Sequence, residues 1–206
     1  MSAKKHWRPW GTTYTVSTDP ADFSQNGGSL LGKIAGKRMA VFRSSSGMED
    51  EFKIEAAERR PDGDTAFARV AGVVYSLNPH REAAKRRVME VMLQPTAPLG
   101  AECDSDLVFR SKAPRWSAVR KTWWLNFGGR VTIPSVRNFQ LIGVSTLPSA
   151  EPAGFMDPDF EDPSVLLQSG KVGKGLYTLD YKAPFSAFTA LAIVLSNMET
   201  SHGMDR

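Results

Sequence analysis

The stretch Phe185-Ser-Ala-Phe-Thr-Ala-Leu-Ala-Ile-Val-Leu195 decides how this sequence of 206 residues folds. It follows Pro184, a residue favoured in the first turn of a helix, and it is rich in Ala and Leu, so we expect a helix here. Ser186 and Thr189 are its only polar members, and none of its side chains is charged. Because a helix that is apolar all round must be buried all round, we expect this segment at the centre of the fold.

The length of this segment limits the alternatives. At ~1.5 Å per residue the helix spans roughly 17–20 Å, which is too short to cross a membrane but close to the height of a small barrel. A signal anchor or an interfacial helix is the competing interpretation. A helix that lies on a lipid surface usually carries Lys or Arg along one side, and this segment carries neither.

Short strand-like runs separated by Gly, Pro, Asn and Asp fill most of the remaining chain. Phe127-Gly-Gly-Arg130 lies between two of them and is typical of a tight hairpin turn. Four prolines and five acidic residues in 145–163 predict a surface loop inside the domain. We expect strands at residues 14–17, 38–42, 67–77, 88–93, 107–110, 122–127, 131–133, 138–144, 165–167 and 176–181.

Many short strands and one apolar helix have few good packings. A two-sheet sandwich would leave half of the helix in water, whereas a sheet closed into a wide barrel can enclose it and leaves no open edges. We therefore predict a mostly β (α+β) fold, a closed antiparallel β-barrel around the buried C-terminal helix. Residues 1–11 are expected to be a short tail or a basic-aromatic segment lying on a membrane, and residues 12–206 a single domain.

Composition narrows the class of protein. Apolar residues make up 41% of the chain, with 11 Phe and 5 Trp, which is enough for a substantial core. The N-terminus has no apolar signal-peptide core, and the single Cys103 excludes an internal disulfide and a cysteine-built metal site. We expect a soluble intracellular protein whose membrane contacts are reversible.

The net charge of +4 is spread unevenly. Acidic residues gather at 49–58 and 151–162, whereas the basic ones form three groups. Such segregation suggests a basic face for an anionic partner, although solvated lysines and arginines scattered over strand faces would also explain it. Composition does not separate lipid phosphate from nucleic-acid phosphate. The basic groups are Lys33, Lys37, Arg38 and Arg43; Arg81, Lys85, Arg86 and Arg87; and Arg110, Lys112, Arg115, Arg120, Lys121, Arg130 and Arg137.

No catalytic constellation is visible. His6, His80 and His202 are far apart in sequence, and Cys103 has no activating neighbour. The glycines of residues 170–175 suggest a phosphate-binding loop, but an expected strand follows them where that motif needs a helix. We expect a protein that is not an enzyme and has no cofactor or metal.

Two late stretches resemble the signature of a known family. Residues 124–141, Trp-Leu-Asn-Phe-Gly-Gly-Arg-Val-Thr-Ile-Pro-Ser-Val-Arg-Asn-Phe-Gln-Leu, resemble the Leu-Asn-Phe-x-Gly-Arg-Val and Ser-Val-x-Asn-Phe-Gln motifs of the tubby family. Residues 170–184 resemble the run that precedes its C-terminal helix. Asp19-Pro20, Gly27-Gly28 and Tyr75-Ser-Leu-Asn78 also follow the family spacing. The resemblance covers roughly residues 12–200. It implies about twelve strands around a central helix, and binding of phosphatidylinositol 4,5-bisphosphate.

The resemblance also implies the site. Lys33 falls on the family's lipid-contacting lysine, although an ordinary solvated loop lysine is the alternative. The arginine expected two residues later is Ala35, and Lys37 and Arg38 close behind are expected to replace it. Thr13 stands where the family commonly has Asn.

One further family arginine falls at Phe67, and Arg69, two residues along the same strand face, is expected to substitute for it. Arg86 and Arg87 are expected to extend the basic face. Asn126 and Asn138 are expected to shape turns instead of binding a ligand.

The resulting expectation is a phosphoinositide-binding peripheral membrane module that acts as an adaptor in membrane or ciliary trafficking or signalling. Its partners would be phosphoinositide headgroups and possible trafficking proteins. We expect a cytoplasmic monomer that visits the plasma or ciliary membrane, with the nucleus as another location. The alternative is a protein- or nucleic-acid-binding scaffold, related to transcription, that uses the basic residues between Arg110 and Arg137.

Overall fold

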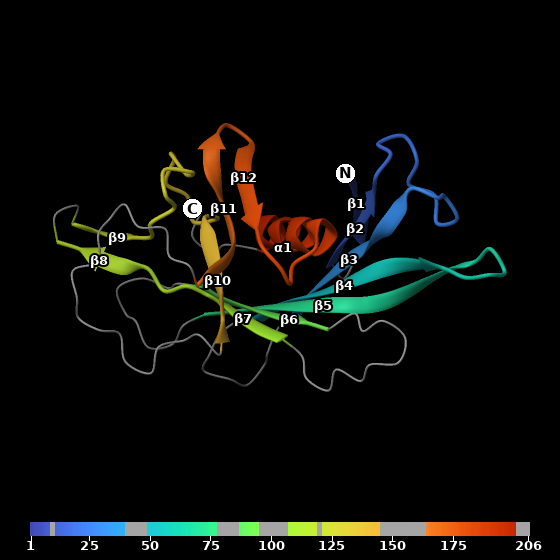
Figure 1. The fold of residues 1–206 in the computed structure, drawn as a ribbon, viewed down its shortest axis with the longest axis horizontal. Coiled ribbons are helices and arrows are strands. Elements are labelled where there is room, and N and C mark those ends of the chain that lie inside the picture. Colours follow the sequence, from blue (N-terminus) through green and yellow to red (C-terminus); the bar gives the residue numbers. More distant parts are fainter. Residues whose placement is uncertain are drawn as a thin grey trace. The chain divides into compact units, whose positions relative to one another are not determined.

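The computed structural model describes residues 1–8, 11–39, 49–77, 87–94, 107–118, 121–144 and 164–200. Within these ranges the chain is mostly β-strand and carries one helix near its C-terminus (Figure 1). The chain divides into two compact units. Unit 1 comprises residues 1–108 and 187–206, and unit 2 comprises residues 109–186.

Unit 1 is built on a sheet whose strands pair antiparallel in the order of the sequence. Each strand is therefore joined to the next along the chain, which is the simplest antiparallel connection. The strands are β1 (Ser2–Arg8), β2 (Gly11–Ser17), β3 (Leu30–Met39), β4 (Glu49–Arg59), β5 (Thr65–Leu77) and β6 (Arg87–Leu93).

One face of this sheet forms the core of unit 1. Because successive side chains on a strand point to opposite faces, every second residue turns inward. Five inward residues, each from a different strand, are fully buried: Val16, Ile34, Ile54, Val73 and Val91. The other face, called the outer face below, carries most of the polar side chains of β3 and β4.

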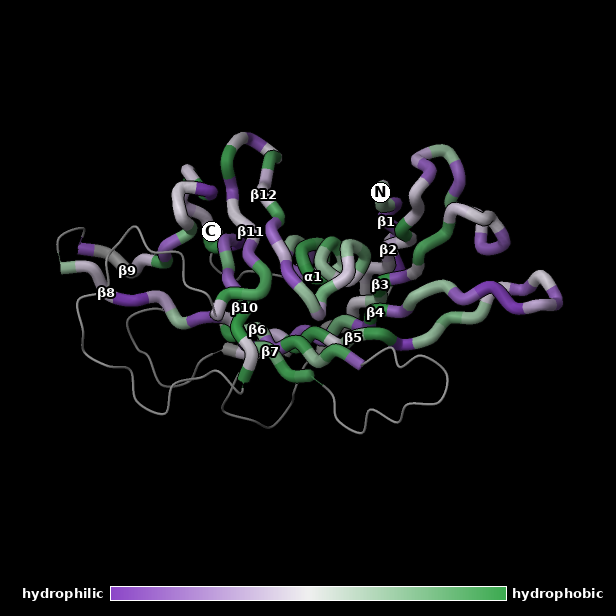
Figure 2. Tube along the Cα trace, viewed as in Figure 1, coloured by the Kyte–Doolittle hydropathy of each residue, from purple (hydrophilic) through white to green (hydrophobic). Residues whose placement is uncertain are grey.

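Helix α1 (Ala187–Glu199) packs on the inner face of unit 1, against β3, β4 and β5 (Figure 1). None of its residues is exposed, and Figure 2 shows hydrophobic residues along it. The closest approach is at Gly32, where a Cβ atom would lie 2.5 Å from Cζ of Phe188 and 2.1 Å from the carbonyl oxygen of Glu55. Only a residue without a side chain lets the helix lie this close to β3.

The helix differs from its prediction at both ends. It begins at Ala187, two residues later than expected, with Ser186 in the N-cap position that serine favours. It continues past Leu195 to Glu199, so it is not free of charge. Leu191 and Leu195 are only half-buried, so burial of the helix is extensive but not complete on every side.

A buried hydrogen bond joins the helix to β5. The hydroxyls of Tyr75 and Ser196 lie 2.7 Å apart, and that of Ser196 also donates to the carbonyl of Ile193 at 2.8 Å. The Tyr75 ring packs edge-on against Phe52, with ring centroids 5.7 Å apart. Both hydroxyls are buried, and a buried hydroxyl without a hydrogen bond would lower the stability of the fold, so each hydroxyl satisfies the other.

The carboxylate of Glu199 fastens the end of the helix to β1 and β2. Its Oε1 lies 2.7 Å from Nζ of Lys5 and accepts a hydrogen bond from the hydroxyl of Tyr14. Burial alone would raise the pKa of Glu199. The hydrogen bonds from Lys5, Tyr14 and Thr12 and the charge of Lys5 outweigh this effect and hold the pKa below its ordinary value of 4.5.

Unit 2 contains a smaller antiparallel sheet and a separate hairpin. In the sheet, the end of β7 (Leu107–Ser111) pairs with β10 (Phe139–Gly143), which pairs with β11 (Val165–Gly173), which pairs with β12 (Leu176–Tyr181). Leu141 and Leu167 are almost completely buried in it. The hairpin consists of β8 (Arg115–Ser117) and β9 (Thr122–Trp124).

Phe127-Gly-Gly-Arg130 forms a turn, as expected, but this turn does not join two paired strands, so the predicted hairpin is wrong. Gly128 and Gly129 have φ values of 54° and 74°, which glycine adopts without strain, and the Arg130 N–H donates to the Phe127 carbonyl at 3.0 Å. The side chain of Asn126 accepts the Gly128 N–H at 2.9 Å. The side chain of Asn138 bridges the Ile133 carbonyl and the Lys171 N–H. The predicted turn-shaping role of both asparagines is therefore correct.

Several expectations are corrected. The strand β1 pairs on one side only, with β2, and β12 pairs on one side only, with β11. Within the described residues the strands therefore do not close into the predicted barrel. Residues 2–8, expected as part of a tail, form β1, and Glu49–Arg59, noted only for its acids, forms β4. Residues 131–133 are not a strand. The loop predicted at 145–163 and residues 40–42 lie outside the described residues.

Candidate functional site

A row of polar side chains crosses the outer face of unit 1. Lys33 on β3 pairs with Thr15 on one side and Glu55 on the other, and Glu55 pairs with Arg69. Lys4 continues the row on β1, opposite Thr15. Residues directly opposite one another in a sheet share a face, with Cβ atoms ~5 Å apart. Five strands thus place three cations and one carboxylate in a single line.

The ammonium of Lys33 lies on an aromatic ring. Its Nζ is 3.5 Å from the centroid of the Phe67 ring, which is well within cation–π distance. Lys33 itself is half-buried, and it forms no ion pair with any residue that the structure describes. The ring holds the ammonium in place without cancelling its charge, so the cation remains available to an anion.

A second cation lies beside Lys33. Ala35, where the expected arginine is missing, pairs with Lys53 on β4, and Lys53 pairs with Gly72 on β5. The space next to Gly72 is occupied by Arg69, whose Nη2 would lie 2.5 Å from a Cβ atom at this position. The Arg69 guanidinium therefore reaches along β5 toward Lys53. We call Lys33, Lys53 and Arg69 the cation cluster.

The cation cluster combines three positive charges with one nearby carboxylate, Glu55. Lys53 and Arg69 are exposed and Glu55 is half-buried, all on neighbouring strands. Neighbouring cations repel one another, and an anion that binds among them relieves this repulsion. Two ammonium groups and one guanidinium also supply enough N–H donors for several phosphate oxygens. The arrangement suits a compact, multiply charged phosphate ligand.

The structure brings together only some of the predicted site residues. Lys33 and Arg69 lie in one row on the outer face with Glu55 between them, and Phe67 lies under the ammonium of Lys33. Thr13 is half-buried on the same face and pairs with Ala35, whereas Lys33 pairs with Thr15, two residues further along β2.

The remaining predicted residues are described only in part. Lys37 and Arg38 belong to β3, where their backbones pair with those of Glu51 and Asp50, and Arg87 begins β6. The side chains of these three residues and all of Arg86 lie outside what the structure describes.

Lys53 was missed in the sequence analysis. It stands between Glu51 and Glu55 and was counted as part of an acidic segment. The signal that could have identified Lys53 is alternation, since the apolar Phe52 and Ile54 alternate with the charged Lys53 and Glu55. This pattern marks a strand with one apolar face and one charged face.

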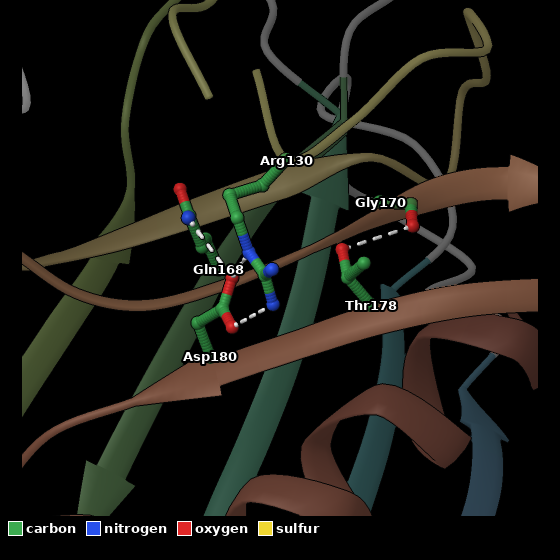
Figure 3. Close-up of polar contacts among 5 residues, drawn as sticks. All are labelled: Arg130, Gln168, Gly170, Thr178 and Asp180. Carbon is green, nitrogen blue, oxygen red and sulfur yellow. Dashed lines mark hydrogen bonds and ion pairs between the residues drawn. The ribbon is translucent and has the colours of Figure 1, made fainter. Parts of the chain in front are cut away.

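A different polar network lies in unit 2 (Figure 3). Arg130 donates to both oxygens of Asp180, with Nη2–Oδ1 at 2.7 Å and Nε–Oδ2 at 3.1 Å. Gln168 donates to Oδ2 of the same carboxylate and accepts from Gln140. The bond from Arg130 holds the pKa of Asp180 below its ordinary value. The guanidinium of Arg130 is therefore committed to a structural contact instead of an external anion.

The described residues show neither a metal-ligand cluster nor a membrane-spanning helix. Among the residues that the structure describes, no three His, Cys, Asp or Glu side chains are grouped as metal ligands. The described part of the chain has no helix of the length and apolarity that crossing a bilayer requires.

Comparison with known proteins connects this chain to a family. Tubby-like F-box protein 6 of Arabidopsis thaliana is 30% identical over 241 aligned positions, which cover 97% of this chain and 57% of the plant protein. Tubby-like F-box protein 2 of the same plant is 28% identical, with 97% of this chain and 61% of that protein covered. Tubby-like F-box protein 8 of Oryza sativa subsp. japonica is 48% identical over 105 positions, 49% of this chain and 23% of that protein. This chain thus spans less than two thirds of these relatives. A model of the Tub family matches residues 1–200, and the chain belongs to that family.

Proposed function

We propose that this protein is a phosphoinositide-binding module that attaches reversibly to membranes, with the cation cluster as its headgroup site. The observation that carries the proposal is the grouping of Lys33, Lys53 and Arg69 on one face, with no ion pair to any described residue. The expected ligand is phosphatidylinositol 4,5-bisphosphate, because three closely spaced cations match the charge of a doubly phosphorylated ring better than that of a single phosphodiester.

The chemistry divides among the three side chains. The planar guanidinium of Arg69 can bind two oxygens of one phosphate, whereas the ammonium groups of Lys33 and Lys53 act as point charges with rotatable donors. Each cation near an anionic leaflet contributes about 1 kcal/mol of attraction. Phe67 limits the movement of Lys33 before binding, so less conformational freedom is lost when the headgroup arrives.

In this proposal the protein acts by binding and not by catalysis. It would associate with the cytoplasmic face of the plasma or ciliary membrane as an adaptor in trafficking or signalling. Protein partners would then be recruited by surfaces other than the cation cluster.

Co-sedimentation with vesicles tests the headgroup site. The full chain should bind phosphatidylcholine vesicles that contain phosphatidylinositol 4,5-bisphosphate and should not bind pure phosphatidylcholine. Replacing Lys33, Lys53 and Arg69 together by Ala should lower the partition coefficient roughly a hundredfold, since each lost charge costs about fivefold. Lys33→Met is a sharper single variant, because it keeps an unbranched side chain over Phe67 and removes only the charge.

Lys174→Ala supplies the matched control. Lys174 is exposed in the turn between β11 and β12, outside unit 1, so its loss removes one charge away from the cation cluster. It should change binding by much less than Lys33→Met does. Equal losses for the two variants would mean that only net charge matters, and the proposed site would be wrong.

A second candidate function is nucleic-acid binding through the basic residues between Arg110 and Arg137. The absence of any acidic residue from Leu107 to Val144 favours it, whereas the ion pair between Arg130 and Asp180 removes one of its cations. A steep fall of oligonucleotide affinity with salt, together with no preference among lipids, would support this alternative.

A further inference from the structure

The β8–β9 hairpin of unit 2 presents a large aromatic side chain at the surface. Trp116 on β8 is 55% exposed. Trp116 pairs with Trp123, and Arg115 pairs with Trp124, so three of the chain's five tryptophans belong to this short hairpin.

The hairpin is also positively charged. Arg115 is exposed on β8, and Lys121 is exposed at the start of β9 with a φ of 49°, in the turn. No acidic residue occurs between Leu107 and Val144. Tryptophan beside Lys and Arg is the composition found where proteins meet the interface of an anionic bilayer.

Within the described ranges, the backbones of β8 and β9 pair with each other. The exposed part of the Trp116 ring becomes favourable when an apolar medium covers it. An indole side chain suits the headgroup region, because its ring is apolar and its N–H is a donor.

We propose that the β8–β9 hairpin is a second membrane contact, which inserts Trp116 into the interface of an anionic bilayer while Arg115 and Lys121 bind lipid phosphates. The inference rests on the proposed function in one respect, since it assumes a protein that works at a membrane. It requires no particular headgroup. In this proposal the hairpin binds any anionic bilayer, through its charge and its inserted indole, whereas the cation cluster selects the phosphoinositide.

The way in which each anionic partner uses aromatic rings favours lipid over nucleic acid as the occupant. A single strand of nucleic acid binds when several bases stack on aromatic rings along a basic groove. The hairpin offers the exposed indole of Trp116, which is better suited to entering a soft interface than to following a strand. Nucleic-acid binding is therefore treated as a competing outcome of the test.

Three vesicle types separate the two sites: phosphatidylcholine alone, phosphatidylcholine with about 20 mol% phosphatidylserine, and the latter with about 5 mol% phosphatidylinositol 4,5-bisphosphate. Trp116→Ala should lower partitioning of the full chain into both anionic vesicles by about tenfold, leaving the preference for phosphoinositide unchanged. The Lys33, Lys53 and Arg69 triple variant should instead lose that preference. Leu176→Ala is the control, because Leu176 is 60% exposed in unit 2 but outside the hairpin.

A spectroscopic readout covers the possibility that Trp116→Ala disturbs folding. Lipids brominated near the headgroup should quench the tryptophan fluorescence of the wild-type chain, and Trp116→Phe should remove a distinct part of this quenching. The proposal is overturned if Trp116→Ala binds anionic vesicles as Leu176→Ala does, if the wild type ignores phosphatidylserine, or if Trp116→Phe is quenched like the wild type. Loss of oligonucleotide binding with vesicle binding unchanged would assign the hairpin to nucleic acid. A failed headgroup site shows differently, as equal binding to both anionic vesicles.

Discussion

In the proposed headgroup site, Glu55 is the residue that we expect to limit the affinity of the cation cluster. Its carboxylate stands in the same row as Lys33 and Arg69, between the two strands that carry them. A bound phosphate would lie close to this negative charge, and like charges at short distance repel even where water screens them. We therefore expect Glu55 to weaken anion binding, and to do so most for an anion that binds close to the sheet between β3 and β5.

Replacing Glu55 by Gln should strengthen binding. The change removes one negative charge and preserves the shape of the side chain, so we expect vesicle affinity to rise by about fivefold for phosphoinositide membranes. Titration of the Glu55→Gln chain with vesicles measures the effect, and Glu58→Gln, an exposed residue further along β4, is the control. An unchanged or lower affinity for Glu55→Gln would place the headgroup elsewhere.

Glu199 gives unit 1 a stability that depends on pH. Its folded pKa is lower than its ordinary value, so the ionised form is favoured in the folded state. The resulting stabilisation is complete above the unfolded pKa of 4.5 and is lost as the pH falls below that value, through the lower folded pKa. Glu199→Gln should therefore melt at a lower temperature than the wild type at neutral pH, and the difference should shrink in acid. A constant difference at every pH would show that the charge is unimportant.

Sequence reasoning reached part of the site and missed the rest for a physical reason. Lys33 and Arg69 were found because a family pattern and strand alternation both mark them. Lys53 was not found, because pairing between β3 and β4 brings it beside Ala35, and a pairing register is a property of two segments together. The ring of Phe67 under Lys33 was invisible for the same reason.

At the scale of elements, helix α1 depends on polar anchors as well as on apolar packing. The pair Tyr75–Ser196 fixes its rotation over β5, and Glu199 fixes its end over β1 and β2. Apolar surface alone would let a helix rich in Ala slide or turn, because small side chains form shallow ridges. The two anchors therefore define one orientation.

Replacing Tyr75 by Phe should destabilise the protein modestly. The change keeps the ring that packs on Phe52 and removes one buried hydrogen bond, which costs about 1 kcal/mol in the free energy of unfolding. Urea denaturation followed by circular dichroism measures this cost. In a double-mutant cycle with Ser196→Ala the two effects should not add, because both substitutions break the same bond. Additive effects would mean that the two hydroxyls do not interact.

The elements that were predicted correctly are those with a clear period. Residues 67–77, 88–93 and 176–181 alternate or carry β-branched residues, and all lie in strands. Two strands, Ser2–Arg8 and Glu49–Arg59, were missed because their many charged residues obscure the apolar–polar alternation. They are strands because they pair with neighbouring strands, on one side for Ser2–Arg8 and on both sides for Glu49–Arg59. The helix starts two residues later than expected, with Ser186 in the N-cap position, whereas Pro184 was expected in its first turn.

At the scale of the whole molecule, the proposed function rests on electrostatic attraction that acts over a surface. The net charge of +4 is modest, but acidic and basic residues are separated along the chain. Exposed charges such as Lys53 and Arg69 attract an anionic surface over about one Debye length, ~10 Å at 0.1 M salt. The described strands show no closure into a barrel, a feature that the length and pattern of single segments did not reveal.

Binding to anionic vesicles should therefore depend strongly on salt. Raising NaCl from about 0.1 M to about 1 M shortens the Debye length from ~10 Å to ~3 Å, so attraction to the membrane should fall steeply. Any remaining binding in high salt should come from Trp116 and should disappear in Trp116→Ala. Vesicle flotation at a series of salt concentrations checks both statements. Salt-independent binding by the wild type would contradict the electrostatic account.

The place of α1 in unit 1 has a consequence for how the protein is made. The strands β1 to β6 leave the ribosome before α1, the helix that packs on the inner face of β3, β4 and β5. During synthesis, Val16, Ile34 and Val73 must wait uncovered while unit 2 is translated, so nascent chains need protection from aggregation during this interval. A premature stop codon anywhere before Ala187 would leave that apolar face permanently open. Such truncated products should be degraded or insoluble, however much of the sheet they contain.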